Sequence, residues 1–86
     1  MRIILSGNLL RFSDFNREFD VDASTVHAGL SALVQQHPSL DGVLFDAERQ
    51  LRGVHRLFLD GQQLDQLETS VGAQSELSIV TAIAGG

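Results

Sequence analysis

Short apolar segments, each bounded by polar or turn-forming residues, divide the chain into several predicted strands. In residues 17–21 the apolar side chains fall on one face and acidic side chains on the other, a spacing typical of a half-buried strand. Residues 1–6, 54–59 and 76–83 are also rich in residues that favour strands. The first of these is too short for its pattern to show whether one face or both are buried.

One helix is predicted between the second and third strands. Its apolar stripe has helical spacing and consists of Val26, Leu30, Leu33 and Val34. Ser24 is the best candidate for the N-cap, because its hydroxyl can accept a hydrogen bond from the first turn. Pro38 ends the helix at or before His37. Gly29 either weakens the helix or marks a close contact with the sheet.

The connections complete the predicted architecture. Residues 7–16 are predicted to form a turn and an irregular loop, so the first two strands pair as an antiparallel hairpin. Residues 39–53 are predicted to form a solvated crossover, and the Asp-Gly pair at 60–61 a tight turn. A return strand at 62–64 and a helical turn at 65–69 follow. The chain is therefore predicted to be an α+β domain with a mixed sheet of four to five strands, one main helix packed across it, and parallel first and last strands.

Composition narrows the class of protein. A chain of 86 residues with 43% hydrophobic and 20% charged residues forms one small folded domain, which we assign to residues 1–82. The absence of cysteine excludes disulfides and thiol catalysis, and no apolar run approaches the roughly 20 residues of a membrane span. The net charge of −5 argues against binding to nucleic acid or membranes. A cytoplasmic location is expected.

The polar residues form no recognisable catalytic or metal-binding pattern. His27, His37 and His55 are far apart in sequence and lack the spacing of metal ligands, so structural or surface roles are expected. The charged residues from Asp46 to Arg52 are interpreted as a solvated loop. We therefore expect no metal, no bound cofactor and no catalytic activity in the chain itself.

The end of the sequence is its most unusual feature. An apolar strand leads into Ile83, Ala84, Gly85 and Gly86, and two final glycines occur by chance in roughly one chain in 200. Because glycine has no Cβ atom, such an end fits a narrow channel and presents the carboxylate of Gly86 without a bulky side chain. We interpret residues 83–86 as a flexible tail on which another protein performs chemistry.

These features together resemble the ubiquitin-like β-grasp proteins, and most closely the prokaryotic sulfur carriers of the MoaD/ThiS family. The resemblance rests on the order of elements, the hairpin sequence LFLDGQQL at 57–64, and the Ala84-Gly85-Gly86 end. The sequence GNLLR at 7–11 resembles loosely, with one extra residue, the Gly-x-Leu-Arg element of the molybdopterin type. The end is most similar to carriers in cysteine and secondary-metabolite sulfuration.

The resemblance implies a function for the carboxylate of Gly86. An E1-like adenylating enzyme would use ATP to activate it, and a sulfur donor would displace AMP to leave a thiocarboxylate. A sulfur-accepting synthase would then consume the sulfur, and a metalloprotease is a further implied partner, because some carriers are trimmed to expose the diglycine. Ile83, Ala84 and Gly85 would thread the partner's active site.

A docking surface is also expected on the sheet. If Leu57, Leu59, Leu77 and Ile79 face the helix, their neighbours in the strands face outward. The predicted docking residues are Arg56, Phe58, Val80 and Ala82. Ubiquitin-like proteins use a similarly placed patch, although Phe58 alternatively rests on its neighbours in the sheet without a binding role.

Three other functions remain open at this point. The chain resembles the small subunit of molybdopterin synthase, which would form a stable complex. It also resembles protein modifiers, which become conjugated to lysines. Finally, a non-covalent binding module would carry the diglycine by chance.

Overall fold

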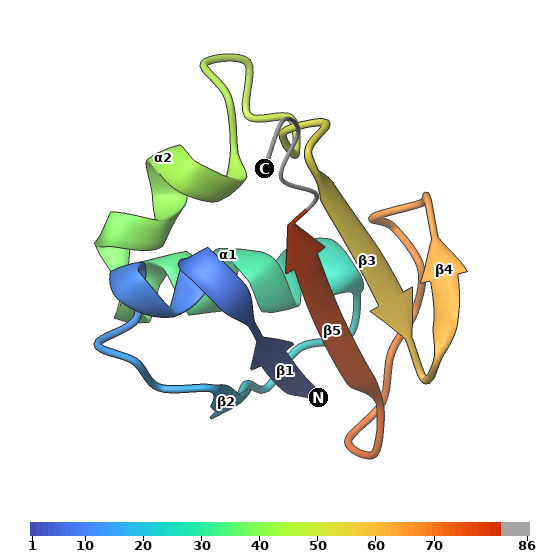
Figure 1. Ribbon diagram of the computed structural model, residues 1–86. Helices are drawn as coiled ribbons and strands as arrows, with labels where there is room; N and C mark the ends of the chain where they lie inside the picture. Colours follow the sequence, from blue (N-terminus) through green and yellow to red (C-terminus); the bar gives the residue numbers. More distant parts are fainter. Residues whose placement is uncertain (82–86) are drawn as a thin grey trace.

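The computed structural model describes residues 1–81. The predicted domain boundary at residue 82, the last two positions of the predicted final strand and the predicted tail at 83–86 lie outside the described residues. The elements (Figure 1) are β1 (Arg2–Leu5), the 3-10 helix η1 (Gly7–Phe12), β2 (Glu18–Asp20), α1 (Val26–Gln36), the 3-10 helix η2 (Pro38–Leu40), α2 (Asp41–Leu44), β3 (His55–Leu59), β4 (Gln62–Leu64) and β5 (Glu76–Thr81).

The five strands form one mixed sheet in the order β2-β1-β5-β3-β4. The two central strands, β1 and β5, run parallel, with Ile3 opposite Leu77, whereas the other neighbouring strands are antiparallel. The predicted α+β fold and the parallel pairing of the first and last strands are therefore confirmed. Between β3 and β4, Asp60 and Gly61 both have positive φ angles, 50° and 89°, as the predicted tight turn requires.

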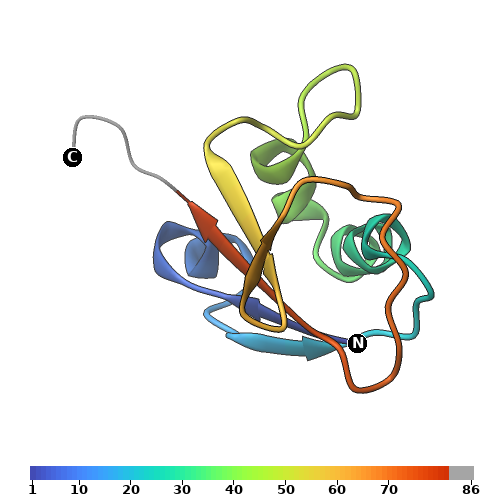
Figure 2. The ribbon, with the colours of Figure 1, turned by 90° about the vertical axis from the view of Figure 1, so that its right-hand side faces the viewer.

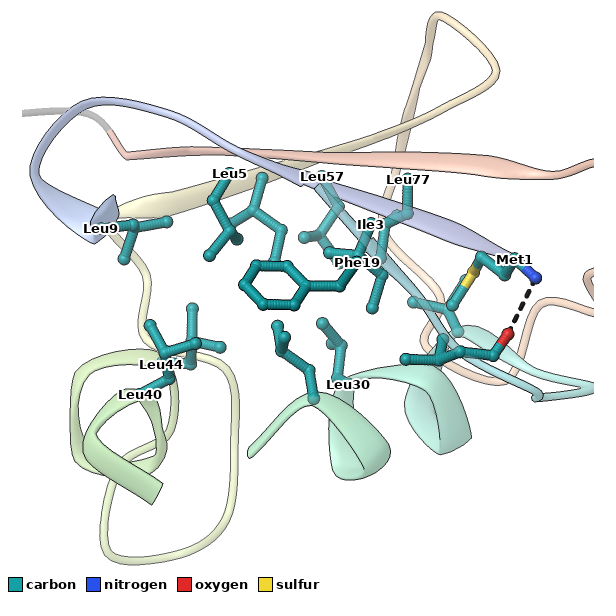
Figure 3. Close-up of a cluster of buried hydrophobic side chains, with 14 of the residues drawn as sticks. Met1, Ile3, Leu5, Leu9, Phe19, Leu30, Leu40, Leu44, Leu57 and Leu77 are labelled. Atoms are coloured by element: carbon teal, nitrogen blue, oxygen red, sulfur yellow. Dashed lines mark hydrogen bonds between the residues drawn. The ribbon is translucent and has the colours of Figure 1, made fainter. Parts of the chain in front are cut away.

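The hydrophobic core lies between the sheet and the helices, with α1 and α2 on the same side of the sheet (Figure 2). Figure 3 shows side chains from the strands facing Leu30 of α1 and the two leucines Leu40 and Leu44. The core residues that are at most 2% exposed include Ile3, Leu5, Leu57, Leu77 and Ile79 from the sheet and Val26, Leu30, Leu33, Leu40 and Leu44 from the helical segments. Burial of each large apolar side chain contributes about 1.5–3 kcal/mol, so this one face of the sheet accounts for most of the hydrophobic stabilisation.

Helix α1 ends as predicted but begins one residue later than predicted. The Thr25 hydroxyl oxygen, not that of Ser24, accepts a hydrogen bond from the Ala28 amide at 3.1 Å. Thr25 has the extended backbone that an N-cap requires, and the Ser24 carbonyl instead accepts from the Val71 amide at 2.9 Å. Gly29 is buried against Met1, so its role is close packing.

The predicted irregular loop at 7–16 is wrong in its first half, which is the 3-10 helix η1. This short helix is held by tertiary packing, because Leu9 is inserted into the core and is 1% exposed. The second half is a tight, hydrogen-bonded turn. There the buried Ser13 hydroxyl donates to the Asn16 carbonyl at 2.8 Å, and Phe15 has a positive φ angle of 62°.

Two further predictions of local structure are corrected. The crossover at 39–53 is not wholly solvated, because η2 and α2 bury Leu40, Leu44 and Phe45 in the core. Residues 65–69 form a hydrogen-bonded turn, in which the Thr69 amide donates to the Gln66 carbonyl at 3.2 Å, but no helix. Their carbonyls are used differently: the Thr69 carbonyl accepts from the Val26 amide at 3.0 Å, and that of Leu67 accepts from the His27 amide at 2.8 Å. The segment thus satisfies amides of the first turn of α1, which have no partner inside the helix.

Candidate partner-docking face

The sheet has a second face, which the helices do not cover. Along β5 the buried Leu77 and Ile79 alternate with Ser78 and Val80, which point to the opposite side. In β3 the buried Leu57 separates Arg56 from Phe58 in the same way. The structure therefore places Arg56, Phe58 and Val80 on one face, as predicted from the alternation. Their docking role stays a prediction.

The strand register shows how these residues are arranged. Ser78 lies between Ile4 of β1 and Phe58 of β3, and Arg56 lies opposite Val80. Phe58 and Val80 are thus diagonal neighbours on adjacent antiparallel strands, about 7–8 Å apart in typical geometry, which an aromatic ring can span. Val80 is 42% exposed, and Ile4, Phe58 and Ser78 are half-buried. We call Ile4, Arg56, Phe58, Ser78 and Val80 the outer-face cluster.

Ile4 and Ser78 are members of this cluster that the sequence-based site prediction missed. Ser78 is at an outward position of the predicted last strand, whereas the pattern of the first strand left the direction of Ile4 open. The predicted parallel pairing of the first and last strands brings them together. The register that places Ile4 opposite Ser78 was the information that the sequence lacked for including both residues in the cluster. Ala82, the remaining predicted docking residue, lies outside the described residues, as do the predicted tail residues Ile83, Ala84, Gly85 and Gly86.

Charged side chains border the cluster. At the start of β1, Arg2 forms exposed ion pairs with Glu18 at 3.5 Å and Asp20 at 3.7 Å, which contribute about 0–1 kcal/mol each. At the other end, the Arg56 guanidinium donates hydrogen bonds to the carbonyls of Gly53 and His55. These bonds hold an exposed positive charge at the start of β3 without neutralising it.

A buried histidine holds the described end of β5 in place. His55 is 4% exposed, and its Nε2 atom lies 2.8 Å from the Val43 carbonyl oxygen, while Nδ1 lies 3.0 Å from the Thr81 hydroxyl. Because a carbonyl only accepts, Nε2 carries a proton and donates it. His55 therefore ties Thr81, the residue before Ala82, to the rest of the domain. This is the structural role expected for a histidine.

The other polar features also have structural explanations. The His37 ring packs edge-on against Phe19, with centroids 4.8 Å apart. Among residues 1–81, no group of three or more acidic, histidine or cysteine side chains is arranged to hold a metal ion. Within that range, no helix is long and apolar enough to cross a membrane. A hollow of about 320 Å³ beside β3 is lined in part by Arg52, Arg56 and Asp65.

No protein-family model and no curated protein sequence matches the chain. Several solved structures match it over nearly its whole length. SAMP1 from Haloferax volcanii is 27% identical, with a TM-score of 0.85 over 99% of this chain and 97% of that one. A chain of the BexX/CysO complex of Amycolatopsis orientalis is 18% identical, with a TM-score of 0.86 over 99% and 98%. A chain of the complex of subunits 1 and 2 of the Helicobacter pylori molybdopterin-converting factor is 20% identical, with a TM-score of 0.66 over 99% and 96%.

These matches support the resemblance and the fold predicted from the sequence. The Haloferax volcanii protein is described as small archaeal modifier protein 1, and the other two structures are complexes of two proteins. The architecture is the ubiquitin-like β-grasp fold of MoaD/ThiS-type carriers.

Proposed function

We propose that this chain, which has the ubiquitin-like β-grasp fold, is a sulfur carrier protein whose reacting group is the carboxylate of Gly86. The observation that carries the proposal is the full-length structural match to carrier and modifier proteins, combined with the Gly85-Gly86 end of the sequence. An ATP-dependent, E1-like enzyme adenylates the carboxylate. A thiocarboxylate then forms and donates its sulfur in the biosynthesis of a cofactor, cysteine or a sulfur-containing metabolite.

The chemistry needs little from the carrier beyond its carboxylate. The carboxylate oxygen of Gly86 attacks the α-phosphorus of ATP, and pyrophosphate leaves. Sulfur from a donor then attacks the carbonyl carbon, and AMP leaves. The activating enzyme binds the ATP and supplies the charge stabilisation for both steps, so we propose that the carrier is a co-substrate and binds no cofactor itself.

The outer-face cluster is the proposed docking surface for this enzyme and for the sulfur-accepting synthase. Val80 is exposed and Phe58 is half-buried, so both offer apolar surface, and Arg56, opposite Val80 in the register, supplies a positive charge. Aromatic residues and arginine are enriched among the residues that dominate binding energy at interfaces. The cluster also extends along β5, the strand that leads in sequence to Ala82, a further proposed contact, and to Ile83, Ala84 and Gly85, which we propose thread the partner's active site.

The central position of β5 supports this proposal. β5 is hydrogen-bonded to β1 on one side and to β3 on the other, and Thr81 is also held by His55. The outer-face cluster is therefore a preorganised surface. Binding of a partner to this surface costs less conformational entropy than binding to a mobile strand would. The donor segment follows directly from this surface in sequence.

Two other functions are favoured by particular comparisons. The Haloferax volcanii neighbour is described as a small archaeal modifier protein, which favours conjugation to other proteins. The Helicobacter pylori neighbour is a two-subunit complex, which favours a stable molybdopterin synthase subunit.

We propose that the carrier is located in the cytoplasm. We also propose a metalloprotease that exposes the diglycine as a further partner.

Intact mass spectrometry tests the proposal. The protein is incubated with a candidate activating enzyme, ATP and inorganic sulfide, and its mass is expected to rise by about 16 Da as sulfur replaces oxygen on the activated carboxylate. A variant that lacks Gly85 and Gly86 is the control and should not change in mass. If the wild-type mass stays constant with an enzyme that thiolates another carrier fully, the proposal fails.

A further inference from the structure

The chain contains very few groups able to attack an activated carboxylate. Its six basic residues are all arginine, so it has no lysine, and it has no cysteine. The guanidinium group of arginine stays protonated in proteins and is a poor nucleophile. Among these 86 residues, the only aliphatic primary amine is therefore the α-amino group of Met1.

The structure buries this amine. The Met1 nitrogen donates a hydrogen bond of 2.9 Å to the Val21 carbonyl inside the protein, as the dashed line in Figure 3 shows. The Val21 amide donates in return to the Met1 carbonyl, also at 2.9 Å. This reciprocal pair continues the β1–β2 ladder by one residue and holds the nitrogen between the two strands.

The Met1 side chain secures the same arrangement. Met1 is 6% exposed and packs on α1 at Gly29, where a β carbon would lie 1.9 Å from the Met1 methyl group. To expose the amine, the protein must release the methionine from the core and break its bonds to β2. Met1 precedes β1 and pairs beside the edge strand β2, so the main cost of this opening is the transfer of the buried methionine side chain into water.

We infer that the folded protein cannot serve as the acceptor of its own activated end. This inference rests on the proposed function. In the reaction that is prevented, an amine nitrogen attacks the activated carbonyl carbon of Gly86, an amide bond forms, AMP leaves, and the nitrogen loses a proton to water. The remaining nucleophiles are histidine rings, whose acyl group is lost again to water, and hydroxyl groups, which are weak nucleophiles unless an adjacent base activates them.

This inference defines which acceptors the protein can use. The acyl group or its sulfur passes only to a nucleophile on another molecule, and the adenylate does not cross-link copies of the carrier. If the protein is also conjugated to lysines of other proteins, each acceptor lysine carries a single copy, because an attached copy offers no amine for the next one. The fold thus gives a donor that does not form chains.

Amine acetylation under native conditions tests the burial directly. N-acetoxysuccinimide is added to the folded protein, and incorporated acetyl groups are counted by intact mass. The matched control is Arg17→Lys, which keeps the charge at an exposed position. The variant should gain one acetyl group rapidly, whereas the wild type should react at least about tenfold more slowly, because the buried Met1 side chain must first leave the core. In denaturant the wild type should gain one acetyl group.

A chemical cross-linking experiment tests the consequence without any activating enzyme. A water-soluble carbodiimide activates carboxylates, and Arg17→Lys should then form covalent oligomers while the wild type stays monomeric. Equal acetylation of the two folded proteins, or equal oligomer formation, would overturn the inference. Because neither reaction uses ATP or a partner, these outcomes are independent of whether the proposed sulfur chemistry is correct.

Discussion

The two faces of the sheet are built from the same strands but differ in almost every physical respect. On the inner face, Leu57, Leu77 and Ile79 are at most 2% exposed and pack against the core. On the outer face, Phe58 is half-buried and Val80 is 42% exposed, without a covering helix. Neighbouring residues in one strand therefore have separate roles: the inner residues stabilise the fold, and the outer residues are available for a partner.

The difference explains how so small a protein combines a rigid fold with a binding surface. A side chain in a close-packed core cannot change in size without a cost in stability. A side chain on an uncovered face changes mainly the surface that a partner meets. If this view is right, substitutions on the two faces should separate stability from partner recognition.

Ile79→Ala should have the largest effect on stability. It removes a fully buried side chain from the central strand, and the lost burial and the resulting cavity should lower the free energy of unfolding by about 2–5 kcal/mol. Urea denaturation measures this loss. The neighbouring Val80→Ala is the control and should change stability by about 0.5 kcal/mol or less, the range of ordinary surface substitutions. Equal losses would contradict the separation of the two faces.

His55→Leu should have the next largest effect. The substitution removes the hydrogen bonds to Val43 and Thr81 and leaves a buried carbonyl without a donor, at a cost of about 1–3 kcal/mol. The matched control is His27→Leu, at an exposed position of α1, with little expected change. Hydrogen exchange at the Thr81 amide should also become faster in His55→Leu. Unchanged exchange there would show that His55 does not hold the end of β5.

Thr25→Ala tests the helix that covers the inner face. Loss of the cap to the Ala28 amide should lower stability by about 1 kcal/mol. Ser24→Ala, one residue earlier, should be nearly neutral because the Ser24 side chain does not cap α1. Thermal unfolding of both variants distinguishes the observed cap from the one predicted by sequence, and a larger loss for Ser24→Ala would reverse the assignment.

A small change in stability is expected for the double variant Phe58→Ser/Val80→Ser. Both side chains lie on the uncovered face, and the loss of stability should be about 1 kcal/mol, mainly from the half-buried Phe58. Binding to the activating enzyme should weaken by at least about tenfold, because interface residues of this kind often contribute more than 1 kcal/mol each. Isothermal titration with the enzyme measures this loss, and unchanged affinity would remove the cluster from the interface.

The sequence predicted the architecture better than its short connecting elements. The positions of the strands along the chain and their inward-facing residues follow from alternation and from apolar content, which depend on the core that all strands share. Helix η1 was missed because it contacts the core through only Leu9, which is buried, and Leu10, which is partly buried, and a 3-10 helix of six residues has no periodic pattern of its own. The 65–69 segment forms a turn but no helix, because its carbonyls accept hydrogen bonds from amides of α1, a long-range contact that local sequence does not encode.

The alternation of residues along the strands also predicted part of the candidate site. Alternation placed Arg56, Phe58 and Val80 outward, but the membership of Ile4 depends on the register between β1 and β5. A shift of one residue would turn Ile4 to the inner face. The burial of the Met1 amine could not be predicted either, because it depends on the pairing of Met1 with Val21 and on the contact with Gly29.

The account is tested most directly by following thiocarboxylate formation in the wild type and in Phe58→Ser/Val80→Ser. Each protein is mixed with the activating enzyme, ATP and sulfide at concentrations below saturation, and the gain of about 16 Da on the activated carboxylate is followed by intact mass over time. We predict that the wild type gains this mass and that the double variant, although folded, gains it at least about tenfold more slowly. Equal rates would contradict the docking role of the outer face, and no gain in the wild type would contradict the role of Gly86.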